Sequence, residues 1–170
     1  PDECGGDYAF EARVRFSTDA STDSGADEMF IGLAERDTTL IASGALDATA
    51  AFVGFASTAT QAGAGGNLSF VSSNGTSISN EGTDGTPLLT ISGTTGVSDF
   101  IRIGFRVANG RAQAFVNGKK VGSEISTNLP SGEVLQPAFV CQTDGSIQTK
   151  FIVDYVMIAA AGRYSGTEAD

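Results

Sequence analysis

Four carboxylates lie close together near the start of the chain, and they are the side chains best suited to hold a metal ion. The polar segment 18–28 contains Asp19, Asp23, Asp27 and Glu28. Carboxylate oxygens are the ligands that Ca²⁺ prefers in proteins. Their spacing is not that of an EF-hand loop, so the sequence favours a solvated polar loop here and leaves a calcium site as the alternative.

Carboxylates can also act in pairs as general acid and general base, as in glycoside hydrolysis, where two acids flank the scissile bond. The candidate members of such a pair are Glu11, Glu28, Glu35, Asp47 and Asp154. An acidic chain offers many such combinations, and nothing in the spacing brings two of them together as a catalytic site requires. We therefore expect no catalytic carboxylate pair.

The sequence contains few of the residues that other kinds of catalysis require. The chain has no His, which removes the commonest general base and the commonest transition-metal ligand. Its serines and cysteines therefore lack the usual activating partner. Gly65-Gly66 is not followed by the Gly-Lys-Ser/Thr of a phosphate-binding loop. The sequence predicts no catalytic residues, no enzyme activity and no cofactor.

Cys4 and Cys141 are the only cysteines, and two interpretations stay open. They could form a disulfide that ties the amino-terminal segment to a late strand, or remain two thiols, one of them buried as a small apolar side chain. No basic segment followed by an apolar run opens the chain, so no signal peptide is expected and the reduced form is favoured.

The charge balance narrows the range of partners. The 170 residues include 10 Lys and Arg against 20 Asp and Glu, a formal net charge of −10 at pH 7. Binding to a nucleic-acid backbone needs clustered cations, so a nucleic-acid partner is not expected, whereas a basic partner surface is allowed. No window approaches the length of apolar sequence that spans a bilayer, so a membrane partner is not expected either.

Segment 100–121 gives the clearest indication of the fold. Its two Asn-Gly pairs, Asn109-Gly110 and Asn117-Gly118, suit two-residue type I′ turns because both central residues need a positive φ. The residues between and before the turns alternate with period two, with Ala112, Ala114 and Val116 on one face. In the preceding strand, one face carries Ile101, Ile103, Phe105 and Val107, and the other carries Phe100, Arg102, Gly104 and Arg106. This pattern predicts a three-stranded antiparallel meander with one solvated side.

Further segments are typical of strands: 7–17, 29–35, 51–56, 67–73, 88–92, 135–143 and 150–159. With 22 Gly and no convincing helical period, they predict an all-β fold, an antiparallel two-sheet β-sandwich. We expect an amino-terminal segment 1–6, one sandwich domain 7–159, and a flexible tail or arm 160–170.

Two late strands raise questions of placement. Pro137 pushes the start of strand 135–143 toward a sheet edge or a bulge. The last strand has two possible inward faces. The favoured face carries Phe151, Val153, Tyr155 and Met157, because Asp154 then points to solvent; the other carries Ile152, Val156 and Ile158.

Taken in order, the strand sequences resemble the concanavalin A-like, LamG-type jelly roll, and more narrowly the capsid decoration or cement proteins of tailed bacteriophages with that fold. The resemblance covers residues 7–159. It is carried by the segments FEARVRF, MFIGLAER, AAFVGFAS, DFIRIGFRVANGRAQAFVNGKKVG, LQPAFV and KFIVDYVMIA.

This resemblance implies a virion structural protein on the outer surface of the capsid, made in the host cytoplasm. It implies a homotrimer that binds the phage major capsid protein and reinforces the shell, with no catalytic residues to transfer. The alternative, from a different class, is a lectin-like carbohydrate-binding module of a phage tail fibre or cell-surface protein. Such a module would bind glycan on a sheet face, and Phe115 beside Arg102 and Arg106 is the one feature that suggests it.

Overall fold

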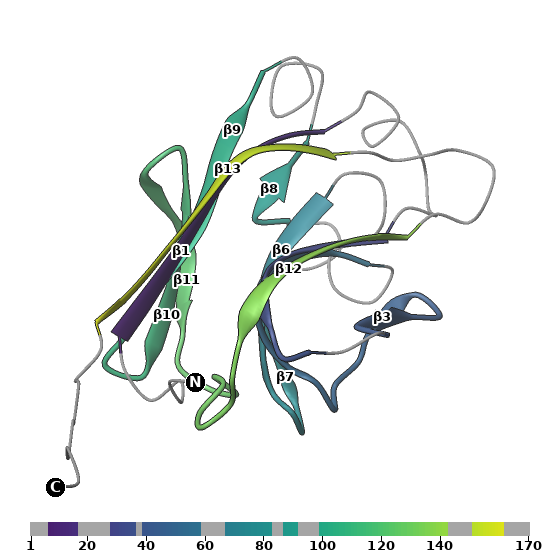
Figure 1. Ribbon diagram of the computed structural model, residues 1–170, viewed down its shortest axis with the longest axis vertical. Helices are drawn as coiled ribbons and strands as arrows, with labels where there is room; N and C mark the ends of the chain where they lie inside the picture. Colours follow the sequence, from purple (N-terminus) through teal and green to yellow (C-terminus); the bar gives the residue numbers. More distant parts are fainter. Residues whose placement is uncertain are drawn as a thin grey trace, which may run out of the picture.

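The structure is a computed structural model that describes residues 7–16, 28–36, 39–58, 67–82, 87–91, 99–142 and 151–161. Within these ranges every regular element is a β-strand, and the strands form two facing antiparallel sheets (Figure 1). The expected all-β sandwich is therefore confirmed. None of these residues belongs to a helix that is long and apolar enough to cross a membrane.

Two main sheets and a small hairpin account for the strands. Sheet A has the order β11-β10-β9-β1-β13, and sheet B has the order β12-β2-β5-β6-β7, with β8 also paired to β6. The strands are β1 (Asp7–Phe16), β2 (Glu28–Ala34), β3 (Ile41–Ala42), β4 (Ala45–Leu46), β5 (Ala51–Ser57), β6 (Asn67–Asn74), β7 (Ile78–Glu81), β8 (Leu89–Thr90), β9 (Ile101–Ala108), β10 (Arg111–Val116), β11 (Lys119–Ile125), β12 (Gln136–Gln142) and β13 (Phe151–Ala161).

The meander β9-β10-β11 forms as the sequence predicts. Asn109 and Gly110 have φ angles of 52° and 70°, and Asn117 and Gly118 have φ angles of 50° and 78°, as type I′ turns require. The predicted inward residues of β9 and β10 are buried, except Val116 at the end of β10, which is half-buried. Strand β11 continues to Ile125, beyond the end expected from the sequence.

The main core lies between the two sheets and is built from phenylalanines. Phe10 of β1 stacks on Phe105 of β9 with 5.4 Å between ring centroids, and Phe105 meets Phe70 of β6 at 5.6 Å. Because β6 belongs to sheet B, this last contact joins the two layers. Each fully buried Phe contributes roughly 1.5–3 kcal/mol through removal of apolar surface from water.

A second apolar cluster covers the outer face of sheet B. Phe30, Phe52, Ala56 and Val71 point outward from β2, β5 and β6, yet all are buried beneath Leu40, Ile41, Leu46 and Ala50 of the β3–β4 hairpin region. This explains why β2 and β5 are apolar on both faces rather than alternating. Among the described residues, nothing comparable covers the outer face of sheet A, which therefore remains the open sheet face.

The last strand departs from the prediction at Asp154. Arg13 of β1 faces Tyr155, but Val14 faces Val153, so Asp154 is an extra residue in a β-bulge. The bulge shifts the alternation by one residue. The inner face then carries Phe151 and Val153, as expected, followed by Val156 and Ile158, whereas Tyr155 and Met157 lie on the outer face. The favoured inward face was thus wrong beyond Val153, because a one-residue insertion reverses every later side chain.

The ends of the predicted domain differ slightly from the structure. Strand β13 includes Ala160 and Ala161, so the first two residues of the expected tail belong to the sheet. The remainder of that tail, residues 162–170, and the amino-terminal segment 1–6 lie outside the described residues. Strand β12 lies at an edge of sheet B, as Pro137 predicts.

Candidate functional site

The open face of sheet A gathers positive charge on an otherwise acidic chain. Period-two alternation places six cations on this outer face: Arg13, Arg15, Arg102, Arg106, Arg111 and Lys120. We call this surface the arginine face. The same strands place four carboxylates there, Asp7, Glu11, Glu124 and Asp154, which leaves a formal balance of +2 where the whole chain has −10.

The register of the sheet sets the centre of this face. Glu11, Gly104, Phe115 and Lys120 lie in one row across β1, β9, β10 and β11. A Cβ atom at position 104 would come within 2.5 Å of the Phe10 carbonyl oxygen, so only glycine allows β1 and β9 to approach this closely.

Phe115 pairs with Gly104, which lies between two arginines on the outer face of β9. Arg102 and Arg106 precede and follow Gly104 on the outer face of β9, and both are exposed. The predicted grouping of Phe115 with Arg102 and Arg106 is therefore confirmed as one shared face. A half-buried aromatic ring on the same face as two exposed arginines offers both an apolar surface and several hydrogen-bond donors.

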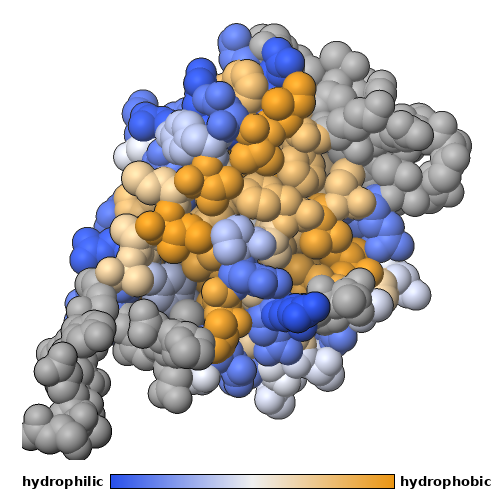
Figure 2. Space-filling view, in the orientation of Figure 1, coloured by the Kyte–Doolittle hydropathy of each residue, from blue (hydrophilic) through white to orange (hydrophobic). Residues whose placement is uncertain are grey.

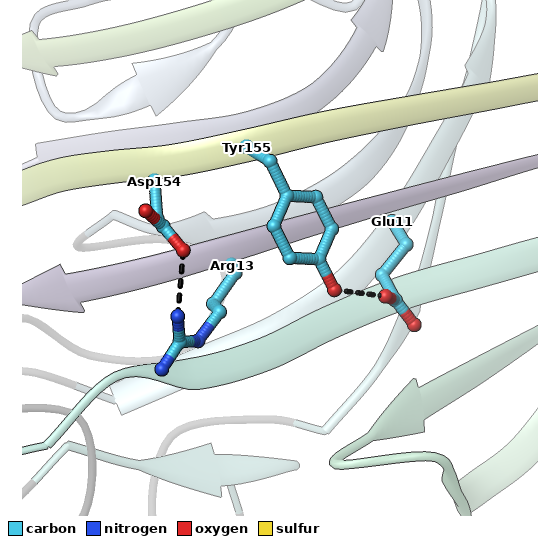
Figure 3. A network of polar contacts seen from close by, with 4 residues as sticks. All are labelled: Glu11, Arg13, Asp154 and Tyr155. Carbon is cyan, nitrogen blue, oxygen red and sulfur yellow. Dashed lines mark hydrogen bonds and ion pairs between the residues drawn. The ribbon is translucent and has the colours of Figure 1, made fainter.

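Four side chains from β1 and β13 form two polar contacts at the border of the face (Figure 3). Arg13 Nη1 donates to Asp154 Oδ2 at 2.6 Å, and the Tyr155 hydroxyl donates to Glu11 Oε1 at 2.5 Å. Both pairs join neighbouring strands across the bulge. They orient the border residues toward solvent instead of toward the core.

The environment of Tyr155 is unusual for an exposed tyrosine. Its hydrogen bond to the Glu11 carboxylate raises the pKa of Tyr155 above its ordinary value, and the positive charge of Arg102 opposes the rise. The phenol is thus held protonated as a hydrogen-bond donor. Arg102 lies close enough to act on the same group, which links the centre of the arginine face to its border.

Other contacts hold the cations in place. The guanidinium groups of Arg13 and Arg15 lie 4.9 and 5.1 Å from the centroid of the Phe100 ring. Arg111 pairs with Glu124 at 3.2 Å, while Arg106 and Asp7 are 3.8 Å apart. Cations organised on a rigid sheet lose little conformational freedom when an anionic partner binds.

The predicted acid–base candidates separate into two groups. Glu11 and Asp154 both lie on the outer face of sheet A, but Glu11 accepts a hydrogen bond from Tyr155 and Asp154 is paired with Arg13. Glu28 and Glu35 belong to the other layer, where Glu28 begins β2 and Glu35 follows its last residue. Asp47 follows β4, and hydrogen bonds from the Thr49 hydroxyl and amide lower the pKa of Asp47.

The predicted calcium loop falls mostly outside the described residues. Asp19, Asp23 and Asp27 belong to the segment 17–27, and only Glu28 is described, as the first residue of β2, where partial burial raises its pKa. Among the described residues no cluster of three or more potential metal ligands occurs. Cys141 lies exposed on β12 and Cys4 is outside the described residues, so their pairing stays an open prediction.

The sequence predicted the wrong face for one member of the site and gave no role to another. Tyr155 was expected inside, and no local pattern signals the bulge that turns it outward, since the extra residue is defined only by pairing with β1. Alternation of period two did place Phe100 on the outer face with Arg102, but the sequence gave no function for it.

Comparison with known proteins establishes similarity of fold. No protein-family model matches the sequence, and no match was found among curated protein sequences. The solved structures include the carbohydrate recognition domain of Emp47p, which is 10% identical over 94% of this chain and 74% of its own, with a TM-score of 0.57. Sheep galectin-11 in complex with glycerol is 12% identical over 93% of both chains, with a TM-score of 0.50.

An enzyme has a comparable fold. Family 7 alginate lyase A1-II′, solved with its substrate, is 12% identical over 91% of this chain and 61% of its own length, with a TM-score of 0.50. Lectins and lyases thus share this architecture, and the fold is compatible with both binding and catalysis. At these identities the likeness concerns architecture alone: the chain has the concanavalin A-like, galectin-type jelly-roll fold.

Proposed function

We propose that this protein is a non-enzymatic binding protein whose recognition surface is the arginine face, and that it decorates the outer surface of a bacteriophage capsid. The observation that carries the proposal is the concentration of cations and aromatic rings on the open face of sheet A. A wide, solvent-facing surface of this kind suits contact with an extended partner. The strand resemblance to capsid decoration proteins supports the choice of the major capsid protein as that partner.

The mode of action would be thermodynamic. A protein that binds only the assembled shell stabilises that state by mass action, in proportion to RT ln(1 + [L]/Kd). Many moderate contacts spread over a rigid sheet are sufficient for this, and no bond needs to be made or broken. The protein would be made in the host cytoplasm and act in the virion.

The test is co-sedimentation of the full chain with purified, undecorated phage heads, followed by heating of the decorated heads. We expect saturable binding at a fixed ratio to major capsid protein and survival of the heads to a higher temperature. The double variant Arg102→Glu/Arg106→Glu should bind the heads with an affinity at least tenfold lower, since it reverses the charge at the centre of the face.

Arg36→Glu is the matched control, because Arg36 is exposed and follows β2 outside sheet A. It should bind heads like the unmodified protein. Failure of the unmodified protein to bind heads would refute the capsid proposal, and equal loss in both variants would refute the assignment of the binding face.

The second candidate is carbohydrate binding by the same face. The half-buried ring of Phe115 between Arg102 and Arg106 could stack against a sugar while the guanidinium groups bind its hydroxyl or acidic substituents. Similar folds that bind or process carbohydrate support this alternative: the Emp47p domain is named for carbohydrate recognition. Binding on a glycan array that is lost in Phe115→Ala, together with no binding to heads, would favour it over decoration.

A further inference from the structure

The last strand presents an apolar surface next to the arginine face, with which it shares Tyr155. Figure 2 shows an apolar band across the molecule at the place that β13 and the neighbouring edge occupy in Figure 1. Six large side chains of β13 are between 37% and 56% exposed, and we call them the β13 strip: Ile152, Val153, Tyr155, Val156, Met157 and Ile158. A continuous apolar patch on a protein surface commonly marks an interaction site.

The strip is exposed on both sides of sheet A. Val153, Val156 and Ile158 belong to the inner face, while Ile152 and Met157 belong to the outer face. Inner-face side chains of a sandwich are normally covered by the opposite sheet. These three are only partly covered, so the sandwich has an apolar mouth between its edge strands β12 and β13.

One aromatic contact crosses this mouth. Phe139 of β12 meets Phe151 of β13 with 6.1 Å between ring centroids. Phe151 is half-buried, whereas the residues that follow it on β13 are exposed. The mouth is therefore bridged at the beginning of β13 and open along residues 153–158.

Strand β13 has few of the features that usually protect a sheet edge. Edge strands are typically short, charged, bulged or interrupted by proline, and of these devices β13 has one bulge, at Asp154. Strand β13 has 11 residues, contains no Pro and, among the strands that the structure describes, pairs with β1 alone. Its single charge, on Asp154, is neutralised by Arg13 at 2.6 Å. Its free backbone edge is thus available for pairing with another strand.

We propose that the β13 strip binds a second copy of this chain, with the open mouths of two copies in contact and β13 continuing into the sheet of the partner. A partner that pairs with this edge must have an unpaired strand with apolar side chains on both faces. Strand β13 is itself such a strand. Two copies that pair antiparallel through it would therefore each cover the inner-face and outer-face residues of the other.

The net charge of the chain and the area of the β13 edge also support a second copy as the binding partner. Chains with a net charge of −10 repel each other, and the neutralised strip is a surface along which two copies can approach. The eleven residues of β13, at about 3.3 Å each, give a strand edge about 36 Å long, and two sheets about 10 Å apart with their outer side chains give a width of about 20 Å. The product, about 700 Å² per copy, is close to the roughly 800 Å² that each partner buries in a stable interface.

This inference is independent of which partner binds the arginine face. Its test is analytical ultracentrifugation of the full chain over a concentration series. The unmodified protein is expected to sediment as a homo-oligomer that dissociates on dilution. Val156→Lys and Ile158→Lys each place a charge in the contact, and both variants are expected to sediment as monomers throughout the series.

Val134→Lys is the matched control. Val134 is 52% exposed but precedes β12 and lies outside the strip, so this variant should associate like the unmodified protein. An unmodified protein that stays monomeric at every concentration overturns the proposal. Lysine variants that associate with the same dissociation constant as the unmodified protein also overturn it.

A second measurement needs no substitution and covers the case in which the lysine variants fail to fold. Hydrogen exchange of the unmodified protein is measured at concentrations above and below dissociation. Amides on the free edge of residues 152–158 should exchange more slowly in the associated form, because they then donate to the partner strand. Equal exchange rates at both concentrations overturn the proposal.

Discussion

Asp154 of β13 has no pairing partner on β1, and its Oδ2 accepts a 2.6 Å hydrogen bond from Arg13 Nη1. The ion pair sits at the point where the strand alternation shifts. Before it, Phe151 and Val153 point inward; after it, Val156 and Ile158 do. The bulge thereby keeps β-branched residues along the mouth and turns the phenol of Tyr155 toward solvent.

Deletion of Asp154 is expected to be tolerated. Without it, the pairs Arg13–Tyr155 and Val14–Val153 become consecutive rungs of a regular ladder, and both halves of β13 keep their faces. The loss should be limited to the exposed ion pair, about 0.2–1 kcal/mol. Thermal unfolding monitored by circular dichroism measures it. Deletion of Val156 is the comparison, and should cost clearly more, because every later residue then changes face.

Gly104→Ala should destabilise the protein strongly for so small a change. The added methyl group would meet the Phe10 carbonyl oxygen at 2.5 Å, where neither backbone can yield without disturbing the β1–β9 ladder. We expect a loss of about 1–3 kcal/mol in the free energy of unfolding by urea. Arg106→Ala, on the same strand and exposed, should stay within about 0.5 kcal/mol. Equal effects of the two substitutions would contradict the close approach.

The pKa of Tyr155 should fall when Glu11 is neutralised. In the unmodified protein the Glu11 carboxylate accepts from the phenol and raises the pKa of Tyr155 above 10.0. Glu11→Gln removes the charge, so the ultraviolet-monitored titration of Tyr155 should move toward lower pH. Tyr155→Phe identifies its signal among the three tyrosines. An unchanged titration in Glu11→Gln would show that the carboxylate does not control this group.

The same shift gives a pH dependence of stability. Because the folded protein holds the Tyr155 proton more tightly than the unfolded chain, the contribution is fully present below the ordinary pKa of 10.0. It is lost as pH rises through the higher folded-state pKa. Denaturant unfolding of the unmodified protein and Glu11→Gln should therefore converge in alkaline solution.

Phe139→Ala should loosen the mouth of the sandwich. The ring lies 6.3 Å from Phe10 and 6.1 Å from Phe151, so it connects β12 to the core and to β13. We expect a loss of about 2–3 kcal/mol in unfolding free energy, less than for a fully buried phenylalanine because Phe139 is half-buried. Phe115→Ala, with its ring on the outer face, should cost roughly 1 kcal/mol. Denaturant titration compares the two variants, and a larger effect at Phe115 would contradict the bridging role of Phe139.

Salt should separate the two proposed surfaces. Binding through the arginine face depends on charge and should weaken as ionic strength rises. Self-association through the β13 strip is apolar, and screening of the repulsion between two acidic chains should leave it unchanged or stronger. Sedimentation at low and high salt, with and without the partner, measures both. Loss of self-association at high salt would contradict an apolar contact.

The sequence determined the parts of the fold that depend on local chemistry. Asn109-Gly110 and Asn117-Gly118 require positive φ, which fixed two turns, and alternation of period two then assigned both faces of β9 and β10. The same alternation placed Phe115, Arg102 and Arg106 on one face. Pro137 marked the edge strand because proline cannot donate to a ladder.

The tertiary structure decided what depends on pairing between distant segments. The face of Tyr155 is set by a bulge against β1, more than a hundred residues earlier, and no local pattern encodes an unpaired residue. The β3–β4 hairpin covers the outer face of sheet B, so sheet A alone presents an open face among the described strands. Whether Val156 and Ile158 are covered or exposed depends on where β12 ends relative to β13. Burial is a property of the neighbours that the fold supplies, and a strand's own sequence specifies only which of its side chains share a face.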